Sequence, residues 1–461
     1  GSIGFCIPYE FNNSDLEASL TFLEKHSFGT QGWSWPTVQY MICEAQYGGR
    51  ITDDFDRILF NDIGRTWLAP DSLEEGFKFC KSPVDFKYIV PKVENVDQYR
   101  KFITSMPDSD SPEIFGLNTN ADLTYGTSEA IYIIETVNET QPKEGGSGAG
   151  GLTREQQVWN KADELVKRMD DKELGYVDDE VREQVRKRPK SEIEFVLGYK
   201  PESKVDGFSI PLNVFLYQDI TRLNDVINTV RNTLNGLKQA IDGEIIMTTQ
   251  LQDSLDAIFD AKPPKHWYID PSGAQYAWTL PSLGLWYEGM IDREAQLSTW
   301  INTTRPFTYW MTGFFNPQGF LTSARQEVTR RHKAEKWALD DVVIVTYMTD
   351  HFDSRKIKGP PDEGIYIHGL FLEGAGWDKS KKMLCEATPK EMYTPMPIIH
   401  VSAVTSESEK KIFGKGEFYS CPVYTVPKRN GLAFIFVAKI PSEVNGRHWV
   451  LRGVGILCSK D

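Results

Sequence analysis

Long apolar runs are missing from this sequence of 461 residues. No stretch reaches the roughly 18 consecutive apolar residues that a membrane-spanning helix needs. The N-terminus also lacks the basic segment followed by an apolar segment that marks a secretory signal. We therefore expect no membrane partner. Because the sequence begins with Gly-Ser in place of Met, we expect it to be a piece of a longer protein.

Clustered cysteines and an excess of basic residues are absent as well. The six cysteines lie far apart, with no Cys-x-x-Cys pair and no Cys/His cluster at zinc spacing, so we interpret them as reduced thiols and predict no metal site. The formal net charge is −14. Nucleic-acid binding requires a concentrated basic surface. The charge therefore argues against nucleic acid as a partner, and equally against direct contact with acidic filaments such as microtubules.

Nucleotide-binding motifs fail on inspection. The Gly-rich stretch KEGGSGAGGLTRE, residues 143–155, places Gly145 and Gly150 at the separation of a GxxxxGK[ST] loop, but Gly151 stands where the phosphate-binding Lys belongs. In LDDVVIVTY, residues 339–347, the acids precede the apolar run, whereas a Walker B strand has them after it. No Ser or Cys has a His and an acid at motif spacing. We predict a flexible linker at residues 143–153, and no catalytic or cofactor-binding residue in this sequence.

The stretch YGGRITDDFDR, residues 47–57, is the strongest candidate for a site, because Asp53, Asp54 and Asp56 could together collect a divalent cation. It lacks the glycine and the final glutamate of a calcium-binding EF-hand loop. A pair of glycosidase carboxylates is formally possible, but nothing in the sequence indicates a substrate groove. A standalone enzyme that uses this acidic cluster therefore stays open as an alternative.

A structural interpretation accounts for every residue of the same stretch, and we favour it. Gly48 and Gly49 would form a turn at positive φ, and Thr52 or Asp53 would cap the helix that follows. The carboxylates would lie in the first helical turn, where the helix dipole favours negative charge. Arg50 and Arg57 would pair with acidic neighbours.

Residues 1–140 read as short helices separated by turns, which predicts a small helical bundle. Ser14 is an N-cap candidate before an apolar face formed by Leu16, Leu20 and Leu23. Pro36 marks the start of a second helix, and EAIYIIETVNETQ forms a third.

An apolar stripe over residues 216–241 follows the 4-3-4-3 spacing of a helix packed lengthwise on another. Its members are Leu216, Ile220, Leu223, Ile227, Val230, Leu234, Leu237 and Ile241. One interpretation is a coiled-coil scaffold that dimerises through residues 216–241. We favour packing within one polypeptide, because Gly243 interrupts the pattern and TTQLQDSLDAIFDA offers the apolar face of a second helix.

The remaining segments indicate core, solvated helices and strands. Charges of alternating sign over residues 154–205 are typical of solvated helices. Aromatic residues between Trp267 and Trp337 lie beside Leu and Met at helical spacing, which favours a core over a base-stacking platform.

After GPPDEG, short apolar alternations in the last hundred residues predict an antiparallel barrel or sandwich. The fold class is therefore α+β.

Eight stretches, taken in order, resemble the C-terminal end of dynein heavy chains. They are IPYEFNNSDLEASL, YGGRITDDFDR, PEIFGLNTNADLTY, GEIIMTTQLQDSLDAIFDAKPPKHW, WMTGFFNPQGFLTSARQEVTRRHKAEKWALDDV, GIYIHGLFLEGAGWD, FYSCPVYTV and HWVLRGVGILC. NADLTYGTSEA, the Gly-rich linker and HWVLRGVGILC resemble axonemal chains. MTGFFNPQGFLTSARQEVTRRHK is most similar to an outer-arm chain of the gamma type.

The resemblance implies an organisation and a function. Residues 1–142 would be the helical lid subdomain of the sixth AAA+ module of the motor ring. Residues 154–360 would be the helical part of the dynein C-terminal domain, and residues 361–461 its terminal β-barrel. The parent chain would be an ATP-driven, minus-end-directed microtubule motor of cilia and flagella that uses Mg-ATP.

The resemblance also implies that the nucleotide-binding modules and the microtubule-binding stalk lie upstream of this segment. The segment itself would then be a structural and regulatory part of the ring, without a cofactor of its own. Its implied partners are the remaining AAA+ modules and the linker of the same heavy chain, and other dynein arm subunits. Microtubules would be contacted only through the parent motor.

Overall fold

The computed structural model divides the chain into two compact units, each built from segments that are separated in the sequence. Unit 1 contains Gly1–Thr136, Leu370–Met396 and Lys415–Lys460, and unit 2 contains Val137–Gly369 and Pro397–Gly414. The structure describes residues 6–7, 9–28, 32–79, 88–108, 111–140, 152–188, 207–414, 416–429 and 431–460. Among these residues, no helix has both the length and the apolar character to cross a membrane. The five described cysteines, Cys6, Cys43, Cys385, Cys421 and Cys458, are free thiols.

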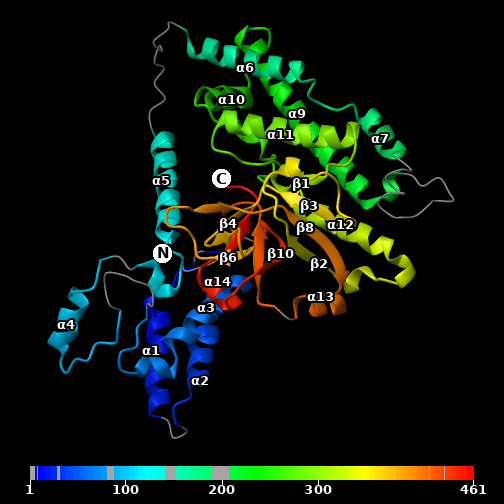
Figure 1. Cartoon of the computed structure of the whole chain (residues 1–461). Helices are drawn as coiled ribbons and strands as arrows, with labels where there is room; N and C mark the ends of the chain where they lie inside the picture. Colours follow the sequence, from blue (N-terminus) through cyan, green and yellow to red (C-terminus); the bar gives the residue numbers. More distant parts are fainter. Residues whose placement is uncertain are drawn as a thin grey trace. The chain divides into compact units, whose positions relative to one another are not determined.

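Unit 1 begins with helices joined by turns (Figure 1). They are α1 (Asn13–Ser27), α2 (Trp35–Tyr40), α3 (Asp54–Trp67), α4 (Val96–Thr104) and α5 (Ala121–Thr140). Pro36 lies in the first turn of α2, as the sequence predicts, because a residue there needs no N–H donor. A π-helical turn, Met41–Gln46, continues α2.

The start of α1 differs from the prediction. Asn12, not Ser14, is the N-cap: its side-chain oxygen accepts hydrogen bonds from the backbone N–H groups of Ser14 and Asp15. Asp15 accepts a hydrogen bond from the N–H of Asn12 in return, at 2.9 Å. This reciprocal capping box satisfies the free N–H groups of the first turn and extends the helix by two residues. The predicted apolar face is only partly covered: Leu16 and Leu20 are about half exposed, and Leu23 is partly buried.

A five-stranded sheet completes unit 1, with the strand order β10-β9-β11-β4-β7. Its strands are β4 (Phe371–Glu373), β7 (Tyr393–Pro395), β9 (Phe418–Tyr424), β10 (Phe434–Pro441) and β11 (Gly455–Leu457). Two further strands, β5 (Gly376–Asp378) and β6 (Met383–Cys385), pair with each other. Leu59 of α3 packs in one buried cluster with Tyr424, Ala433 and Leu457. The N-terminal helices and the C-terminal strands therefore share a core.

Buried polar bonds reinforce this junction just before α5. Asn120 is 3% exposed, and its amide group donates hydrogen bonds to the carbonyls of Thr388 and Glu391, at 2.9 and 3.1 Å. Its side-chain oxygen accepts a hydrogen bond from the N–H of Lys390 at 2.7 Å. The side chain of Asn118 donates to the carbonyl of Arg452 at 2.9 Å. Four hydrogen bonds thus connect the start of α5 to residues near the C-terminal sheet.

Unit 2 is organised around one long helix, α9 (Pro211–Ile241). The helices that pack against it (Figure 1) are α6 (Arg154–Asp171), α7 (Asp178–Lys187), α10 (Thr249–Phe259), α11 (Leu283–Asn302) and α12 (Pro317–Arg331). A four-stranded sheet has the order β1-β3-β8-β2. Its strands are β1 (Thr308–Trp310), β2 (Val342–Met348), β3 (Ile365–His368) and β8 (Ile399–Thr405), and α13 (Ser406–Phe413) follows β8.

The fold is α+β, but the predicted terminal barrel is wrong. The strands of the described residues form separate sheets in the two units, and two of the pairings, β1 with β3 and β11 with β9, are parallel. Alternating apolar residues predict strands but not their partners, which the long-range packing decides. One apolar stretch of the last hundred residues, HWVLR at residues 448–452, forms no strand. α14 (Gly446–Leu451) covers its first four residues, and Asn445 caps this helix by accepting a hydrogen bond from the N–H of Arg447.

The apolar stripe of α9 is buried inside unit 2. Seven of its eight residues, from Leu216 to Leu237, are at most 1% exposed. The helix ends where the sequence predicts, because Gly243 adopts φ +80°, and the N–H of Glu244 bonds to the carbonyl of Gln239 at 2.9 Å. This burial supports the intramolecular interpretation, since dimerisation through residues 216–241 would require the surrounding helices to separate.

The aromatic segment forms core, as predicted. Trp267, Trp286 and Trp300 are fully buried. The buried guanidinium of Arg293 lies 4.1 Å from the ring centroid of Trp278 and donates hydrogen bonds to two backbone carbonyls. These rings fill the space between helices and do not present a stacking platform.

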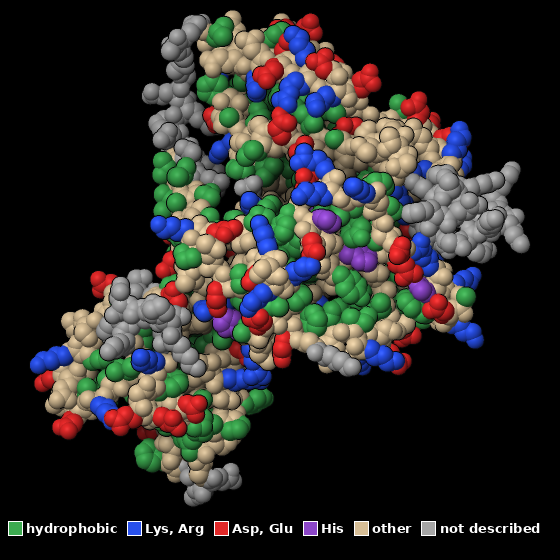
Figure 2. Space-filling view, viewed as in Figure 1, with side chains coloured by type: hydrophobic (Ala, Val, Ile, Leu, Met, Phe, Trp, Pro, Cys, Tyr) green, Lys and Arg blue, Asp and Glu red, His purple; other side chains and the backbone are tan. Residues whose placement is uncertain are grey.

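The two described helices of the charged segment, α6 and α7, are solvated on one side only. Figure 2 shows acidic and basic side chains intermixed over α6 and α7 on the face that it draws. Each of these helices also buries an apolar face, which includes Leu165 and Met169 of α6 and Val185 of α7. Residues 143–151 of the predicted linker lie outside the described residues, as do residues 189–205 of the charged segment.

The burial of the α9 stripe predicts a large effect for a single truncation. Leu223→Ala, at the centre of the stripe, should lower the free energy of unfolding by about 2–5 kcal/mol, because the lost methyl groups leave a cavity. Leu285→Ala on α11 removes the same atoms from a leucine that is 53% exposed, and should change stability by less than about 0.5 kcal/mol. Urea denaturation of both variants tests this difference. Equal midpoints would contradict the assignment of α9 as the central helix.

Candidate functional site

The glycines of residues 47–57 act through close packing and not through positive φ. Gly48 and Gly49 lie in a 3-10 turn, Gly48–Arg50, and neither has a positive φ, so the predicted turn conformation is wrong. A Cβ atom on Gly48 would lie 1.8 Å from the carbonyl oxygen of Cys43. The backbone returns so closely over the π-helical turn that a larger residue does not fit.

The three carboxylates of this stretch have separate structural tasks. Asp53 caps α3 by accepting hydrogen bonds from the N–H groups of Phe55 and Asp56, at 2.9 and 3.1 Å, which confirms the predicted cap. Asp56 is 2% exposed and accepts from the N–H groups of Cys6 and Ile7, at 2.6 and 3.0 Å. Asp54 is exposed on the first turn. The structure thus brings Asp53 and Asp56 together and leaves Asp54 apart.

Hydrogen bonds around Asp56 tie two segments of unit 1 together. Ligand-type atoms of Cys6, Asp53 and Asp56 lie within 4.8 Å of one another. Burial raises the pKa of the Cys6 thiol to about 12. Burial also raises the pKa of Asp56, against the opposing effect of the two N–H donors. The arrangement fastens the first described residues to α3, with the Cys6 sulfur 3.1 Å from the Tyr424 hydroxyl.

Arg50 and Arg57 do pair with acids, but outside the stretch. Arg50 lies 3.0 Å from Asp15 of α1, and Arg57 lies 3.5 Å from Glu44 of the π-helical turn. The stretch therefore connects neighbouring elements of unit 1, as a structural interpretation requires.

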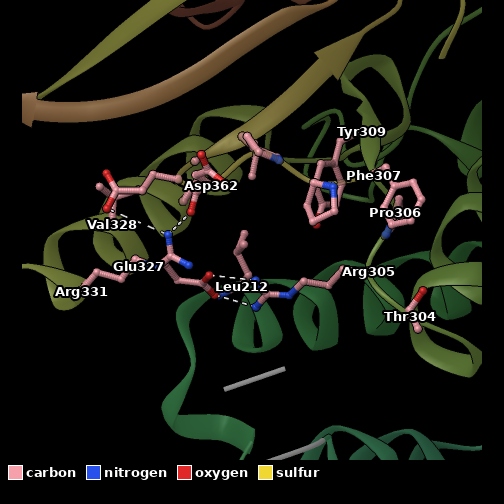
Figure 3. Close-up of a pocket in the computed structure, with 16 residues that line it drawn as sticks. Leu212, Thr304, Arg305, Pro306, Phe307, Tyr309, Glu327, Val328, Arg331 and Asp362 are labelled. Carbon is pink, nitrogen blue, oxygen red and sulfur yellow. Dashed lines mark hydrogen bonds and ion pairs between the residues drawn. The ribbon is translucent and has the colours of Figure 1, made fainter. Parts of the chain in front are cut away.

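Unit 2 contains a cavity of about 430 Å³ that the sequence analysis did not anticipate (Figure 3). Its walls come from the start of α9, from α12, from the loop before β1 and from the GPPDEG segment before β3. The lining side chains include Leu212, Pro306, Phe307, Tyr309, Ala324, Val328, Pro361 and Ile365, together with Arg305, Glu327, Arg331 and Glu363. Most of the lining is apolar.

A buried ion pair forms one wall of the cavity. Two guanidinium nitrogens of Arg305 donate to the two carboxylate oxygens of Glu327, at 2.9 and 2.7 Å (Figure 3), and both side chains are largely buried. Glu327 also accepts a hydrogen bond from the N–H of Leu212 in the first turn of α9, at 3.3 Å. The N-cap residue of α9, Ile210, has no side-chain acceptor. The carboxylate of Glu327 on α12 therefore replaces the missing side-chain N-cap of α9, at a helix end where the dipole favours negative charge.

Arg331, one helical turn after Glu327 on α12, is a second charged residue of the lining. Arg331 donates to the carbonyl of Asp362 and lies 4.0 Å from the carboxylate of Glu363 (Figure 3). Glu363 also contacts the His332 ring nitrogen at 2.8 Å. Burial lowers the pKa of His332, but the hydrogen bonds to Glu335 and Glu363 outweigh burial and raise it. Each positive charge in this wall thus has an acidic neighbour.

Sequence reasoning missed this cavity because its residues come from four separate segments. In the sequence, GPPDEG indicates a break between two elements, but in the structure its residues line one side of the cavity. Gly364, the last residue of this segment, adopts φ +80°, and an added Cβ would lie 2.1 Å from the carbonyl oxygen of Val401. Nothing in the spacing of Arg305 and Glu327 indicates that they meet.

The tie between Asp56 and the first described residues predicts unequal effects for neighbouring aspartates. Asp56→Ala should lower the free energy of unfolding by about 1–3 kcal/mol, because two N–H groups lose their acceptor in a buried place. Asp54→Ala, two positions away, should cost less than about 1 kcal/mol, since it loses a favourable helix-dipole interaction alone.

Urea denaturation measures both changes, and a titration with Mg²⁺ and Ca²⁺ provides the control. Divalent-cation binding that disappears in Asp54→Asn would contradict the structural assignment and would restore the enzyme alternative.

Comparisons with known proteins agree with the resemblance noted in the sequence. Residues 1–121 match the family model of the AAA lid domain of the dynein heavy chain. Residues 127–458 match the family model of the C-terminal domain of the dynein heavy chain.

Relatives include dynein axonemal heavy chain 8 of Mus musculus, 41% identical over 99% of this chain. The dynein gamma chain of the flagellar outer arm of Chlamydomonas reinhardtii is 39% identical over 100% of this chain. The dynein-1-beta heavy chain of the flagellar inner arm I1 complex of the same organism is 32% identical over 99%. The chain spans 9%, 10% and 9% of the lengths of these three relatives. Because two dynein heavy chain models together cover nearly all of it, this protein belongs to the dynein heavy chain family.

Proposed function

We propose that this protein is the C-terminal part of an axonemal dynein heavy chain of the outer-arm gamma type, and that it serves as a non-catalytic, structural and regulatory part of the motor ring. The observation that carries the proposal is the order of the two family matches, lid first and C-terminal domain second, over almost the whole sequence. The identity of 39% to an outer-arm gamma chain, against 32% to an inner-arm chain, supports the subtype.

The parent protein would be an ATP-driven, minus-end-directed microtubule motor in the axoneme of a cilium or flagellum. The lid would extend to about residue 142, with a connection at residues 143–153 and the C-terminal domain after it. Other AAA+ modules, the linker of the same heavy chain and other dynein arm subunits would be its partners. Microtubules would be reached through the parent motor.

The shared core of unit 1 suggests how the segment works. Strands of the C-terminal domain pack on α3 of the lid through Leu59 and Tyr424, and buried hydrogen bonds of Asn120 join the same regions. A packed core is a stiff connection, because its side chains interdigitate at close-packed density. The C-terminal domain would therefore brace the lid, so that a conformational change in the ring is transmitted and not absorbed.

A nucleotide titration tests the non-catalytic assignment. Isothermal titration of the 461-residue protein with Mg-ATP and with Mg-ADP should show no heat of binding up to millimolar nucleotide, because neither the Gly-rich stretch nor LDDVVIVTY has the residues that hold phosphate and magnesium. Binding with micromolar affinity would overturn the proposal of a passive brace.

The brace itself can be tested in the full-length heavy chain. Asn120→Ala removes three hydrogen bonds between the lid and the C-terminal sheet region, and should slow microtubule gliding by about twofold or more while ATP turnover stays nearly constant. Asn228→Ala, at an exposed position on α9, should leave both rates unchanged. Wild-type gliding in Asn120→Ala would refute a role of this junction in transmission.

A further inference from the structure

The cavity of unit 2 has the size and the composition of a small-molecule pocket. Its volume of about 430 Å³ lies within the usual range of roughly 300–1,000 Å³ for ligand sites, which are mostly apolar with a few fixed polar groups. Leu212, Ala324, Val328 and Ile365 line it and are at most 5% exposed. Phe307 is 45% exposed, so the lining extends from the core of unit 2 to solvent.

Charge decides which class of ligand fits this cavity. Arg305 is bound through two hydrogen bonds to Glu327, and Arg331 is held by the carbonyl of Asp362 beside Glu363. An anionic ligand would have to compete with these acids for the guanidinium groups. A cationic ligand would have to compete with the arginines for the acids. Burying a charge without a new partner is costly, whereas an uncharged ligand leaves both arrangements intact.

Rigid rings define the shape of the available space. Figure 3 shows Pro306, Phe307 and Tyr309 together at one side of the cavity, opposite Val328 and Arg331. Pro360 and Pro361 add two more rings to the lining, and proline has little conformational freedom to lose. A pocket walled by stiff rings is formed in advance, so binding costs little ordering entropy. Flat ring systems also stack favourably on Phe and Tyr.

We propose that this cavity is a binding site for an uncharged aromatic or alicyclic small molecule, which packs against Phe307 and Tyr309 and leaves the Arg305–Glu327 pair in place. This proposal does not depend on the function proposed above. Because Glu327 also caps α9, an occupied cavity would stabilise the start of the central helix of unit 2.

Two fluorescent probes with the same ring skeleton test the proposal on the 461-residue protein. N-phenyl-1-naphthylamine is uncharged, and 8-anilinonaphthalene-1-sulfonate carries a sulfonate. The uncharged probe should bind saturably at one site per molecule with enhanced fluorescence. The sulfonate should bind about tenfold more weakly or worse, because its charge finds no free partner in the cavity. Equal or tighter binding of the sulfonate would refute the ligand class.

Matched variants locate the bound probe. Phe307→Ala should weaken binding of N-phenyl-1-naphthylamine by about fivefold or more, because it removes a ring from the wall. Phe352→Ala removes a ring of similar exposure (41%) that does not line the cavity, and should leave the affinity unchanged. Both residues are partly exposed, so both variants should fold, and thermal denaturation verifies this.

A second substitution changes the interior of the cavity. Ala324→Leu adds side-chain volume to a buried lining position, and should reduce the affinity for N-phenyl-1-naphthylamine to a similar degree. Absence of probe binding to the wild-type protein, or affinity that is equal in all four proteins, would overturn the proposal.

Discussion

Burial of the apolar stripe of α9 is the interaction on which unit 2 depends. Five helices pack against α9, and each must bury an apolar face of its own in this contact. Full burial of a large aliphatic side chain is worth about 1.5–3 kcal/mol, so the stripe is a dominant favourable contribution before conformational entropy is subtracted. Even the charged helices α6 and α7 follow this rule, since their apolar sides face inward.

Unit 1 depends on a different principle, which is contact between distant parts of the sequence. Leu59 belongs to the segment that resembles a lid, whereas Tyr424 and Leu457 belong to the C-terminal strands, and together they form one buried cluster. Hydrogen bonds also join distant segments of unit 1, since Asn120 donates to the carbonyl of Thr388 and Asn118 to that of Arg452. Loss of either segment would therefore expose the core of the other.

Local signals in the sequence predicted local structure well. Asp53 caps α3, Pro36 starts α2 and Gly243 ends α9, because caps and stops depend on a few neighbouring residues. The spacing from Leu216 to Leu237 likewise predicted a buried helix face. Some local details were wrong, such as the N-cap at Ser14 and the positive φ at Gly48. The error in topology arose where partners are distant: alternation in the last hundred residues could not show that the strands divide among the sheets of two units. The cavity could not be predicted from the sequence for the same reason, since Arg305 and Glu327 meet only when β1, α12 and α9 have packed.

The order of segments has a consequence for synthesis of the protein. Cys6 and Tyr424 touch, yet 418 residues separate them, and unit 1 is interrupted by most of unit 2. A ribosome that adds about 5–20 residues per second needs roughly 20–80 s to cover that distance. Throughout this interval, the helix that carries Leu59 has emerged without the strands that bury it. Unit 2 can meanwhile fold around α9, so a premature stop after it would leave the lid with an uncovered apolar surface, which is the kind of species that chaperones recognise and that aggregates in their absence.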